Sequence, residues 1–505
     1  MGKLEMIAHT KDGGGLTMRV LFLQPPLGWW AAWKKHIANN VAHAQLAANI
    51  REWYPEIEIK VLDTRALGMD EKQMVDAITE LNPNLIYMGD ALQTTGVAAI
   101  HPRYQQAAKV IKQVLPDVKI CVGGFFYGAN APAMLEKTPE FDFVVAGETE
   151  RTVPELAKEL SKSDPDIPSV RGLAYRDENG EVKLTEYRPL IENLDDLPLP
   201  AYDLFPMDKY VGFNYIRHYV ETYMTRGCPN GCRFCVGWTN YDPRGNHDWT
   251  HYRPRSPKLM ADEMELLVKR FGAKFICMMD EDLNVYRERM EGLIEELKRR
   301  NLKVPFFFMG RAPYHLRDRD LLKPLREVGF VCGLFGMEAV DKETLEAIKK
   351  GTTVDEVAEL VGLFRENNIM SVVTWMVGFP EDDEQRIKDR VERLDLMDPD
   401  MAALQILTPL PGIPLYKQLE PYTEEWNLLK WDFQHAVLRT KHLSRQDLGR
   451  LAAWANREFY SKPGRVQRIL YDKRYHPFCR LIARVYVETA GKEHAQAAVE
   501  DKIFV

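Results

Sequence analysis

Short apolar runs alternate with segments of helical periodicity along most of this chain, and this alternation constrains the fold more than any other feature. In the first 160 residues the apolar runs fall at 20–23, 57–62, 85–88, 119–122 and 143–145. Strands that alternate with helices form a parallel sheet, and ligands bind beyond the carboxyl ends of its strands. The sequence therefore predicts a doubly wound, Rossmann-like α/β domain over residues 1–165.

The alternation resumes at about residue 215. Strand candidates lie at 220–224, 275–278, 305–308, 332–335, 372–377 and 403–407. Six strand–helix units are too few for a closed eight-fold barrel, so we expect a partial (β/α)6 TIM barrel over residues 211–420. Active groups of such a barrel lie on the loops that follow its strands.

The remaining segments connect or follow these two parts. An Asn179-Gly180 pair between strand-like runs indicates a hairpin, and prolines interrupt residues 194–204. We assign residues 166–210 to a hairpin and linker. The pattern changes again near residue 420, and we expect a mainly helical C-terminal domain over residues 421–505.

Three cysteines, Cys228, Cys232 and Cys235, are clustered directly after the first strand of the predicted barrel. Three thiolates at this spacing can hold three corners of a [4Fe–4S] cluster and leave the fourth iron open to a small molecule. Their position on a loop after a barrel strand supports a functional role.

A zinc site and a disulfide framework are the alternatives. Structural zinc takes four ligands, and the nearest upstream histidine, His218, lies in a strand-like stretch. A disulfide framework is disfavoured because 7 cysteines in 505 residues are sparse and odd in number. The other cysteines are scattered singly and resemble small core side chains: Cys121, Cys277, Cys332 and Cys479. We favour the open cluster.

Composition agrees with a cytoplasmic enzyme. The formal net charge is −7 with acids and bases interspersed, which argues against a surface for nucleic acid. No apolar run approaches the length of an integral membrane segment, and the N-terminus has no signal-peptide core. An oxygen-sensitive cluster would also suit a reducing compartment.

At this point the chain resembles the radical S-adenosylmethionine (radical SAM) superfamily, in the branch with an N-terminal cobalamin-binding domain and class B methyltransferases. The most specific match is Cys228-x3-Cys232-x-Phe234-Cys235. Further matches follow in the expected order: Arg-Pro-Arg-Ser-Pro at 253–257, Met-Asp-Glu-Asp-Leu at 279–283, Arg311, Gly-Met-Glu at 336–338, Trp-Met-Val-Gly-Phe-Pro at 375–380 and Leu-Thr-Pro-Leu-Pro-Gly at 407–412.

The resemblance implies that the cysteines bind a [4Fe–4S] cluster whose open iron takes the amine and carboxylate of SAM. Acceptor-only carboxylates suit the SAM ammonium or ribose hydroxyls, and a guanidinium suits its carboxylate. The implied SAM-binding residues are Phe234, Asp280, Glu281, Arg311, Glu338, Gly378 and Leu407. A solvated strand end is the alternative for each carboxylate, and a surface ion pair is the alternative for Arg311.

The resemblance also implies cobalamin in the N-terminal domain. The motif that supplies a cobalt-binding histidine is missing after the first strand, so the cofactor would bind without one. Asp90 stands where a serine is common in the tail-binding element. Trp29, Trp30 and Trp33 could line the corrin or pack in the core. The implied cobalamin-binding residues are Gln24, Pro25, Pro26, Asp63, Asp90, Leu92, Gly123, Gly124, Gly147 and Glu148.

These cofactors imply a radical methyltransferase that acts on an unactivated carbon of a small-molecule or peptidyl substrate. It would need a one-electron donor such as flavodoxin or ferredoxin. Two alternatives stay open: a radical SAM enzyme of the same architecture that catalyses cyclisation or another non-methylating reaction, for example on a tetrapyrrole or lipid, and a non-enzymatic cluster or cobalamin carrier or sensor.

Overall fold

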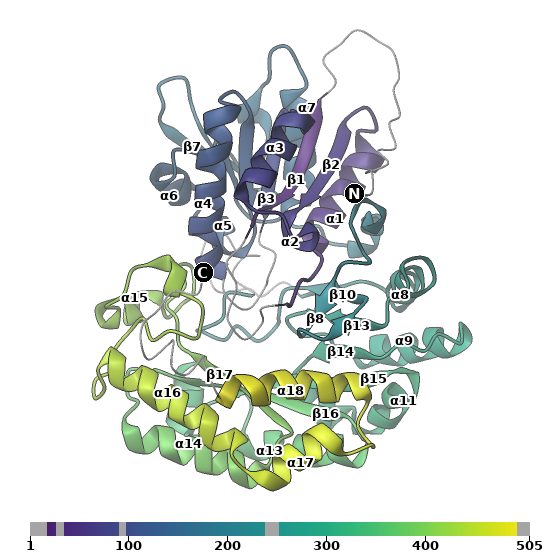
Figure 1. Ribbon diagram of the computed structural model, residues 1–505, viewed down its shortest axis with the longest axis vertical. Helices are drawn as coiled ribbons and strands as arrows, with labels where there is room; N and C mark the ends of the chain where they lie inside the picture. Colours follow the sequence, from purple (N-terminus) through teal and green to yellow (C-terminus); the bar gives the residue numbers. More distant parts are fainter. Residues whose placement is uncertain (1–17, 27–34, 90–96, 238–251, 492–505) are drawn as a thin grey trace.

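The computed structural model describes residues 18–26, 35–89, 97–237 and 252–491, which form two stacked α/β parts (Figure 1). The N-terminal part contains a seven-stranded sheet of order β2-β1-β3-β4-β5-β6-β7. Its first five strands are parallel and match the predicted runs: β1 (Arg19–Gln24), β2 (Glu58–Asp63), β3 (Leu85–Gly89), β4 (Lys119–Gly123) and β5 (Phe143–Val145).

Helices cover both faces of this sheet. The apolar residues of α1 (Val41–Trp53) and α7 (Thr149–Leu160) pack with one set of alternating strand residues, and those of α3 (Glu71–Leu81) and α4 (Val97–Val114) pack with the other set. Every residue of β3 is buried, as expected for a strand covered on both sides. The predicted doubly wound domain is confirmed. Shorter helices complete it: α2 (Thr64–Leu67), α5 (Phe125–Gly128) and α6 (Ala131–Lys137).

The predicted hairpin forms the antiparallel edge of this sheet. Its strands, β6 (Leu173–Arg176) and β7 (Val182–Leu184), follow β5 in the sheet. Gly180 takes a left-handed conformation in the turn, with φ of 79°. The hairpin therefore adds strands to the N-terminal sheet, although the sequence suggests only a connection.

The second part is a six-stranded parallel sheet whose strands follow chain order, β10-β13-β14-β15-β16-β17. Its first and last strands are not paired with each other in this sheet, so the barrel is partial, as predicted. The strands are β10 (Tyr219–Thr222), β13 (Phe275–Met278), β14 (Phe306–Met309), β15 (Phe330–Glu338), β16 (Met370–Val377) and β17 (Met401–Ile406). The helices are α8 (Pro257–Phe271), α9 (Arg287–Arg299), α10 (Ala312–Arg317), α11 (Leu322–Val328), α12 (Lys342–Ala347), α13 (Val354–Glu366) and α14 (Glu384–Met397).

The chain between β1 and α1 attaches the N-terminal part to the free edge of the barrel. The side-chain amide of Asn39 donates to the carbonyl of Glu221 (3.0 Å) and accepts from its backbone N–H (2.8 Å). A short antiparallel pair, β8 (Val211–Gly212) and β9 (Ile216–Arg217), lies beside this contact. These contacts satisfy backbone groups that an edge strand would otherwise expose.

The C-terminal residues are mainly helical, as expected. Helices α16 (Arg445–Tyr460), α17 (Pro463–Tyr471) and α18 (Pro477–Gly491) lie across the barrel, where α16 packs against α14 and β17 (Figure 1). Before them, α15 (Tyr416–Leu419) and the 3-10 helix Leu428–Lys430 follow β17, and the 3-10 helix contacts α4 of the N-terminal part. Within the described ranges, no helix is long and apolar enough to span a membrane.

Candidate active site

The cysteines lie on a loop between two short paired strands, β11 (Thr225–Arg226) and β12 (Arg253–Pro254). Gly227 and Gly231 have φ angles of 75° and 60°, a left-handed conformation that glycine adopts without strain. Within the described residues, none of the three cysteines forms a disulfide bond. The cysteines thus follow the first barrel strand, β10, as predicted. Cys121, Cys277, Cys332 and Cys479 are buried elsewhere in the chain.

Backbone and side-chain contacts hold the cysteine loop in place. The Arg233 N–H donates to the carbonyl of Ile348 (3.0 Å), and its carbonyl accepts from the N–H of Leu415 (3.1 Å). Two further N–H groups point at sulfurs. The Asn230 side chain donates to Cys228 Sγ and the Gly237 backbone donates to Cys235 Sγ, both at 3.3 Å. Donors directed at sulfur favour thiolates, the form that binds iron.

Burial opposes that ionisation when no metal is bound. It raises the pKa of Cys235 to about 12, and it raises the pKa of Cys228 as well. No group of three or more His, Cys, Asp or Glu side chains among the described residues is arranged to hold one metal ion. A [4Fe–4S] cluster does not need ligands that converge on one ion, because each cysteine binds a separate iron atom. The three thiols on one loop fit that donor set.

Glu281 follows β13 and lies against the loop beside Cys235. A Cβ atom at Gly237 would lie 2.9 Å from Glu281 Cγ and 3.5 Å from Cys235 Sγ. Both carboxylate oxygens of Glu281 are buried and have no hydrogen-bond partner in the described part of the chain. Burial raises the pKa of Glu281 well above its ordinary value. A buried acceptor that lacks a donor fits a cationic ligand such as the SAM ammonium.

Two neighbouring acids extend this acceptor surface. Asp280 Oδ1 accepts from Met224 N (2.8 Å) and Thr225 Oγ1 (2.6 Å), so one of its oxygens holds the strand that leads into the loop. Asp282 Oδ2 accepts from the Asn230 amide (3.2 Å). Their other oxygens are buried without a partner among the described residues. Burial raises the pKa of Asp280 to about 6 and that of Asp282 to about 7.

Glu338, at the end of β15, has a partner that the sequence analysis missed. Lys350 Nζ donates to Glu338 Oε1 (2.8 Å), and Thr374 Oγ1 donates to the same oxygen (3.1 Å). Glu338 has φ of 69°, an uncommon conformation for a residue with a side chain. Burial alone would lower the pKa of Lys350, but Glu338 and Cys232 outweigh it and raise that pKa.

Lys350 therefore lies as a buried cation between a candidate SAM contact and the cysteine loop. No spacing in the sequence distinguishes it from Lys349 beside it, which is exposed. Lys350 is buried because of the path that the chain takes between α12 and α13.

Arg311 is buried and already hydrogen-bonded. Its guanidinium donates to the carbonyl of Lys350 and to Thr352 Oγ1. Phe234 is partly buried against the core, and the N–H of Leu407 donates to Val377 O (2.9 Å). Gly378 follows β16 with φ of 99°. Direct SAM contacts by these four residues stay predictions.

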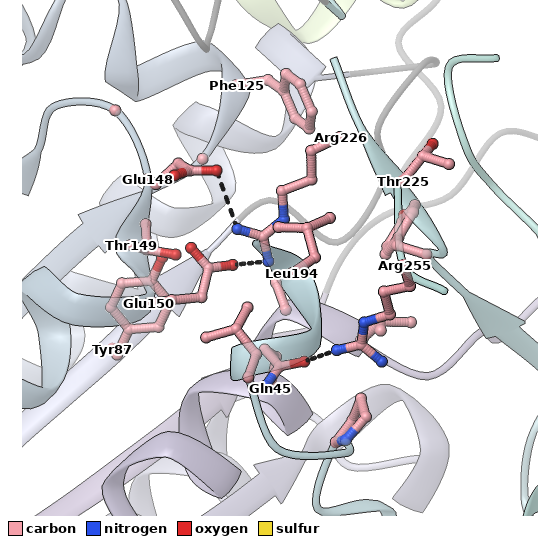
Figure 2. Close-up of a pocket in the computed structure, with 17 residues that line it drawn as sticks. Gln45, Tyr87, Phe125, Glu148, Thr149, Glu150, Leu194, Thr225, Arg226 and Arg255 are labelled. Carbon is pink, nitrogen blue, oxygen red and sulfur yellow. Dashed lines mark hydrogen bonds and ion pairs between the residues drawn. The ribbon is translucent and has the colours of Figure 1, made fainter. Parts of the chain in front are cut away.

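A cavity of about 100 Å³ joins the N-terminal sheet to the strand that enters the cysteine loop. Gly124, Gly147 and Glu148, three predicted cobalamin residues, line it together with Tyr223 and Thr225 from the barrel side (Figure 2). Gly124 and Gly147 have φ of 113° and 89°. The carboxyl-end loops of both sheets thus meet here, where glycines let a ligand approach the backbone. The cavity is smaller than typical ligand pockets, so it could take only part of a corrin.

Two other predicted cobalamin residues, Gln24 and Asp63, have partners within the protein. Gln24 Oε1 accepts from the Asn40 amide, while Gln24 Nε2 is buried with no partner in the described ranges. Asp63 caps α2 and accepts from the Tyr210 hydroxyl (3.0 Å). A Cβ atom at Gly123 would lie 2.7 Å from Tyr87 Oη. Pro25 and Pro26 directly follow β1.

Asp90, Leu92, Trp29, Trp30 and Trp33 lie outside the described residues. The cobalamin assignments stay predictions. The Nε2 group of Gln24 is available to donate a hydrogen bond at the carboxyl edge of the sheet, and Gly124 and Gly147 leave space beside the backbone there. Both features fit a cofactor that hydrogen-bonds at this edge.

Comparison with known proteins agrees with this geometry. Residues 222–394 match the model of the Radical SAM superfamily. The anaerobic magnesium-protoporphyrin IX monomethyl ester cyclase of Rubrivivax gelatinosus is 26% identical over 85% of this chain and 75% of its own length. An uncharacterized methyltransferase of Pyrococcus horikoshii is 26% identical over 93% of this chain and 99% of its own.

The solved structure of the cobalamin-dependent SAM radical enzyme OxsB, with aqua-cobalamin and SAM bound, is similar over 96% of this chain and 72% of that one. The TM-score is 0.70 and the identity 15%. This likeness concerns the fold, including the stacking of an N-terminal α/β domain on a partial barrel. Residues 222–394 are therefore similar to the Radical SAM superfamily, and the chain as a whole has a fold similar to that of a solved cobalamin-dependent SAM radical enzyme.

Proposed function

We propose that this protein is a cobalamin-dependent radical SAM methyltransferase that methylates an unactivated carbon. One observation carries the proposal. Three cysteines lie on a loop with the carboxyl edge of the N-terminal sheet on one side and, on the other, buried carboxylate oxygens that have no partner among the described residues. A cationic ligand of the loop would then lie between the two α/β parts. The methyltransferase of Pyrococcus horikoshii, which matches almost end to end, supports methyl transfer.

Each part of the site has a role in this reaction. Cys228, Cys232 and Cys235 would hold the cluster, and Glu281, with Asp282, would accept the SAM ammonium. Lys350 pairs with Oε1 of Glu338, and the other carboxylate oxygen would accept from ribose hydroxyls. When bound, the cluster would supply one-electron reduction of SAM, and cobalamin would supply the methyl group.

The chain after β17 limits access of water to the site. Leu410, Ile413 and Leu415 are buried, and the backbone of Leu415 bonds to that of Arg233 in the cysteine loop. A reactive radical must be kept from solvent, because water and oxygen would divert it. The apolar segment 410–415 fits this need.

Cyclisation without methyl transfer is a second candidate, because the Rubrivivax gelatinosus relative is named as a cyclase. Methyl-deuterated SAM separates the two. The reconstituted protein would be incubated anaerobically with labelled SAM, a reductant and a small-molecule extract. We expect 5′-deoxyadenosine and S-adenosylhomocysteine together, with label in a new product. Formation of 5′-deoxyadenosine without S-adenosylhomocysteine would contradict methyl transfer.

A further inference from the structure

Four charged side chains meet at the base of the cysteine loop; we call them the arginine–glutamate clamp (Glu148, Glu150, Arg226 and Arg253). The two glutamates begin α7 in the N-terminal part, and the two arginines belong to β11 and β12. No side chain of the clamp is more than 15% exposed. The clamp therefore lies inside the molecule, between its two α/β parts.

Each arginine of the clamp contacts Glu148, and Arg226 also contacts Glu150. Arg226 reaches Glu148 Oε1 (3.1 Å) and Glu150 Oε1 (2.5 Å), as Figure 2 shows. Arg253 contacts both oxygens of Glu148, at 2.9 and 3.1 Å. Glu148 is thus the shared acid of two arginines. Arg253 Nη1 donates a hydrogen bond to Oε2 and its other terminal nitrogen forms an ion pair with Oε1, so both oxygens of Glu148 have a charged partner.

The loop needs this acid because its base is a pair of like charges. Arg226 and Arg253 are direct cross-strand partners in the β11–β12 pair. Like charges opposite each other destabilise a strand pair. Burial would raise the pKa of Glu148, but the two arginines outweigh it and hold that pKa below its ordinary value. Glu148 is therefore ionised and compensates both arginines.

The linker joins the same cluster. Ile191 N donates to Glu148 Oε2 (2.8 Å), and Ile191 O accepts from Arg253 Nη1 (2.6 Å). The N-terminal domain, the linker and the loop base thus converge on one carboxylate. Arg226 is two residues from Cys228, so a movement of this base would be passed directly to the first cluster ligand.

We propose that Glu148 is a positioning residue that fixes the base of the cysteine loop to the N-terminal domain. It thereby sets the distance between the cluster and the carboxyl edge of the N-terminal sheet. The inference rests on the proposed function, in which two cofactors react across this boundary. Misplacement of reacting groups by about 1 Å can reduce a rate roughly a hundredfold.

A distance measurement on the full chain tests this role directly. Lys72 on α3, whose side chain is 82% exposed, is replaced by cysteine and spin-labelled after cluster reconstitution. Pulsed EPR then measures the distance from the label to the reduced cluster. The test variant is Glu148→Gln. The matched control is Glu155→Gln, which removes the partner of Arg188 from the same helix, away from the loop.

We expect a narrow distance distribution in the otherwise unchanged chain and in Glu155→Gln, and a broader, shifted distribution in Glu148→Gln. An unchanged distribution in Glu148→Gln would overturn the inference. If Glu148→Gln binds no cluster, Glu150→Gln replaces it, because it removes only one contact of Arg226. A smaller shift is then expected, and no shift would overturn the inference. The measurement needs no cobalamin, so failure to bind a corrinoid would contradict the proposed function separately.

Discussion

At the scale of single residues, Glu281 is the side chain that most directly connects the cysteine loop to a SAM site. Charge-assisted hydrogen bonds contribute about 1.5–3 kcal/mol. We therefore expect Glu281→Gln to weaken SAM binding by roughly tenfold to a hundredfold, with the iron content unchanged. Titration of the reduced cluster with SAM, followed by EPR, measures this affinity.

The matched control is Glu291→Gln on α9, which loses only an exposed ion pair with Arg287. It should bind SAM as the unchanged protein does. Equal affinities for Glu281→Gln and this control would remove Glu281 from the site.

Lys350 and Glu338 should act as one unit. Removal of one member of a buried ion pair leaves an uncompensated charge and costs about 3–5 kcal/mol of the free energy of unfolding. We expect Lys350→Met to show such a loss, and the double variant Lys350→Met with Glu338→Gln to recover part of it. Chemical denaturation of the unchanged protein, of Lys350→Met, of Glu338→Gln and of the double variant measures the coupling. Strictly additive losses would show that the two side chains act independently.

Three buried histidines should make the fold sensitive to acid. Burial lowers the pKa of His43 to about 3, of His101 to about 4 and of His315 to about 3. An unfolded chain protonates histidine near pH 6.5, before the folded chain does. Stability is therefore complete above pH 6.5 and falls as the pH drops from 6.5 towards 3, by up to about 1.4 kcal/mol per pH unit and histidine.

Replacement of His43 separates the contribution of one histidine to this loss of stability at low pH. His43 Nε2 accepts from the N–H of Gly89 (3.0 Å), and a glutamine could keep an acceptor there. Between pH 7 and pH 5 the free energy of unfolding should fall by about 2 kcal/mol less in His43→Gln than in the unchanged protein. Denaturant titrations at both pH values supply the comparison. An identical loss in both proteins would mean that His43 does not titrate on unfolding.

At the scale of elements, the contact between the cysteine loop and the end of β13 depends on the absence of a side chain at Gly237. The Cβ of Gly237→Ala would lie 2.9 Å from Glu281 Cγ, which forces Glu281 to move. We expect weaker SAM binding with unchanged iron content. Gly362→Ala on α13, where no atom lies within 4 Å of the new Cβ, is the control and should bind SAM normally. Unaltered SAM affinity in Gly237→Ala would contradict this packing.

The elements themselves could be predicted from the sequence because strand runs and helix periods are local signals. Strands β1 to β5 and the six barrel strands fall within a few residues of their predicted positions. The cysteine spacing also located the loop. Lys350 and the arginine–glutamate clamp could not be predicted, because local periodicity does not show which charged side chains meet once the chain has folded. Spacing along a sequence carries no information about which distant charges meet.

At the scale of the whole molecule, the two parallel sheets turn their carboxyl ends towards a common boundary. The cavity there is lined from both sides, and buried hydrogen bonds such as Asn39–Glu221 and the arginine–glutamate clamp hold the parts together. The proposed function assigns a separate cofactor to each α/β part, and a common boundary would let the two be aligned for reaction with one substrate.

Metal analysis of the anaerobically reconstituted protein tests this division of roles most directly. We predict about four irons and one corrinoid per chain, and loss of the iron but not of the corrinoid in Cys235→Ala. Four irons without corrinoid uptake would contradict the cobalamin role of the N-terminal domain and the proposed methyl transfer. Iron retained in full by Cys235→Ala would contradict the assignment of the cysteine loop as the cluster site.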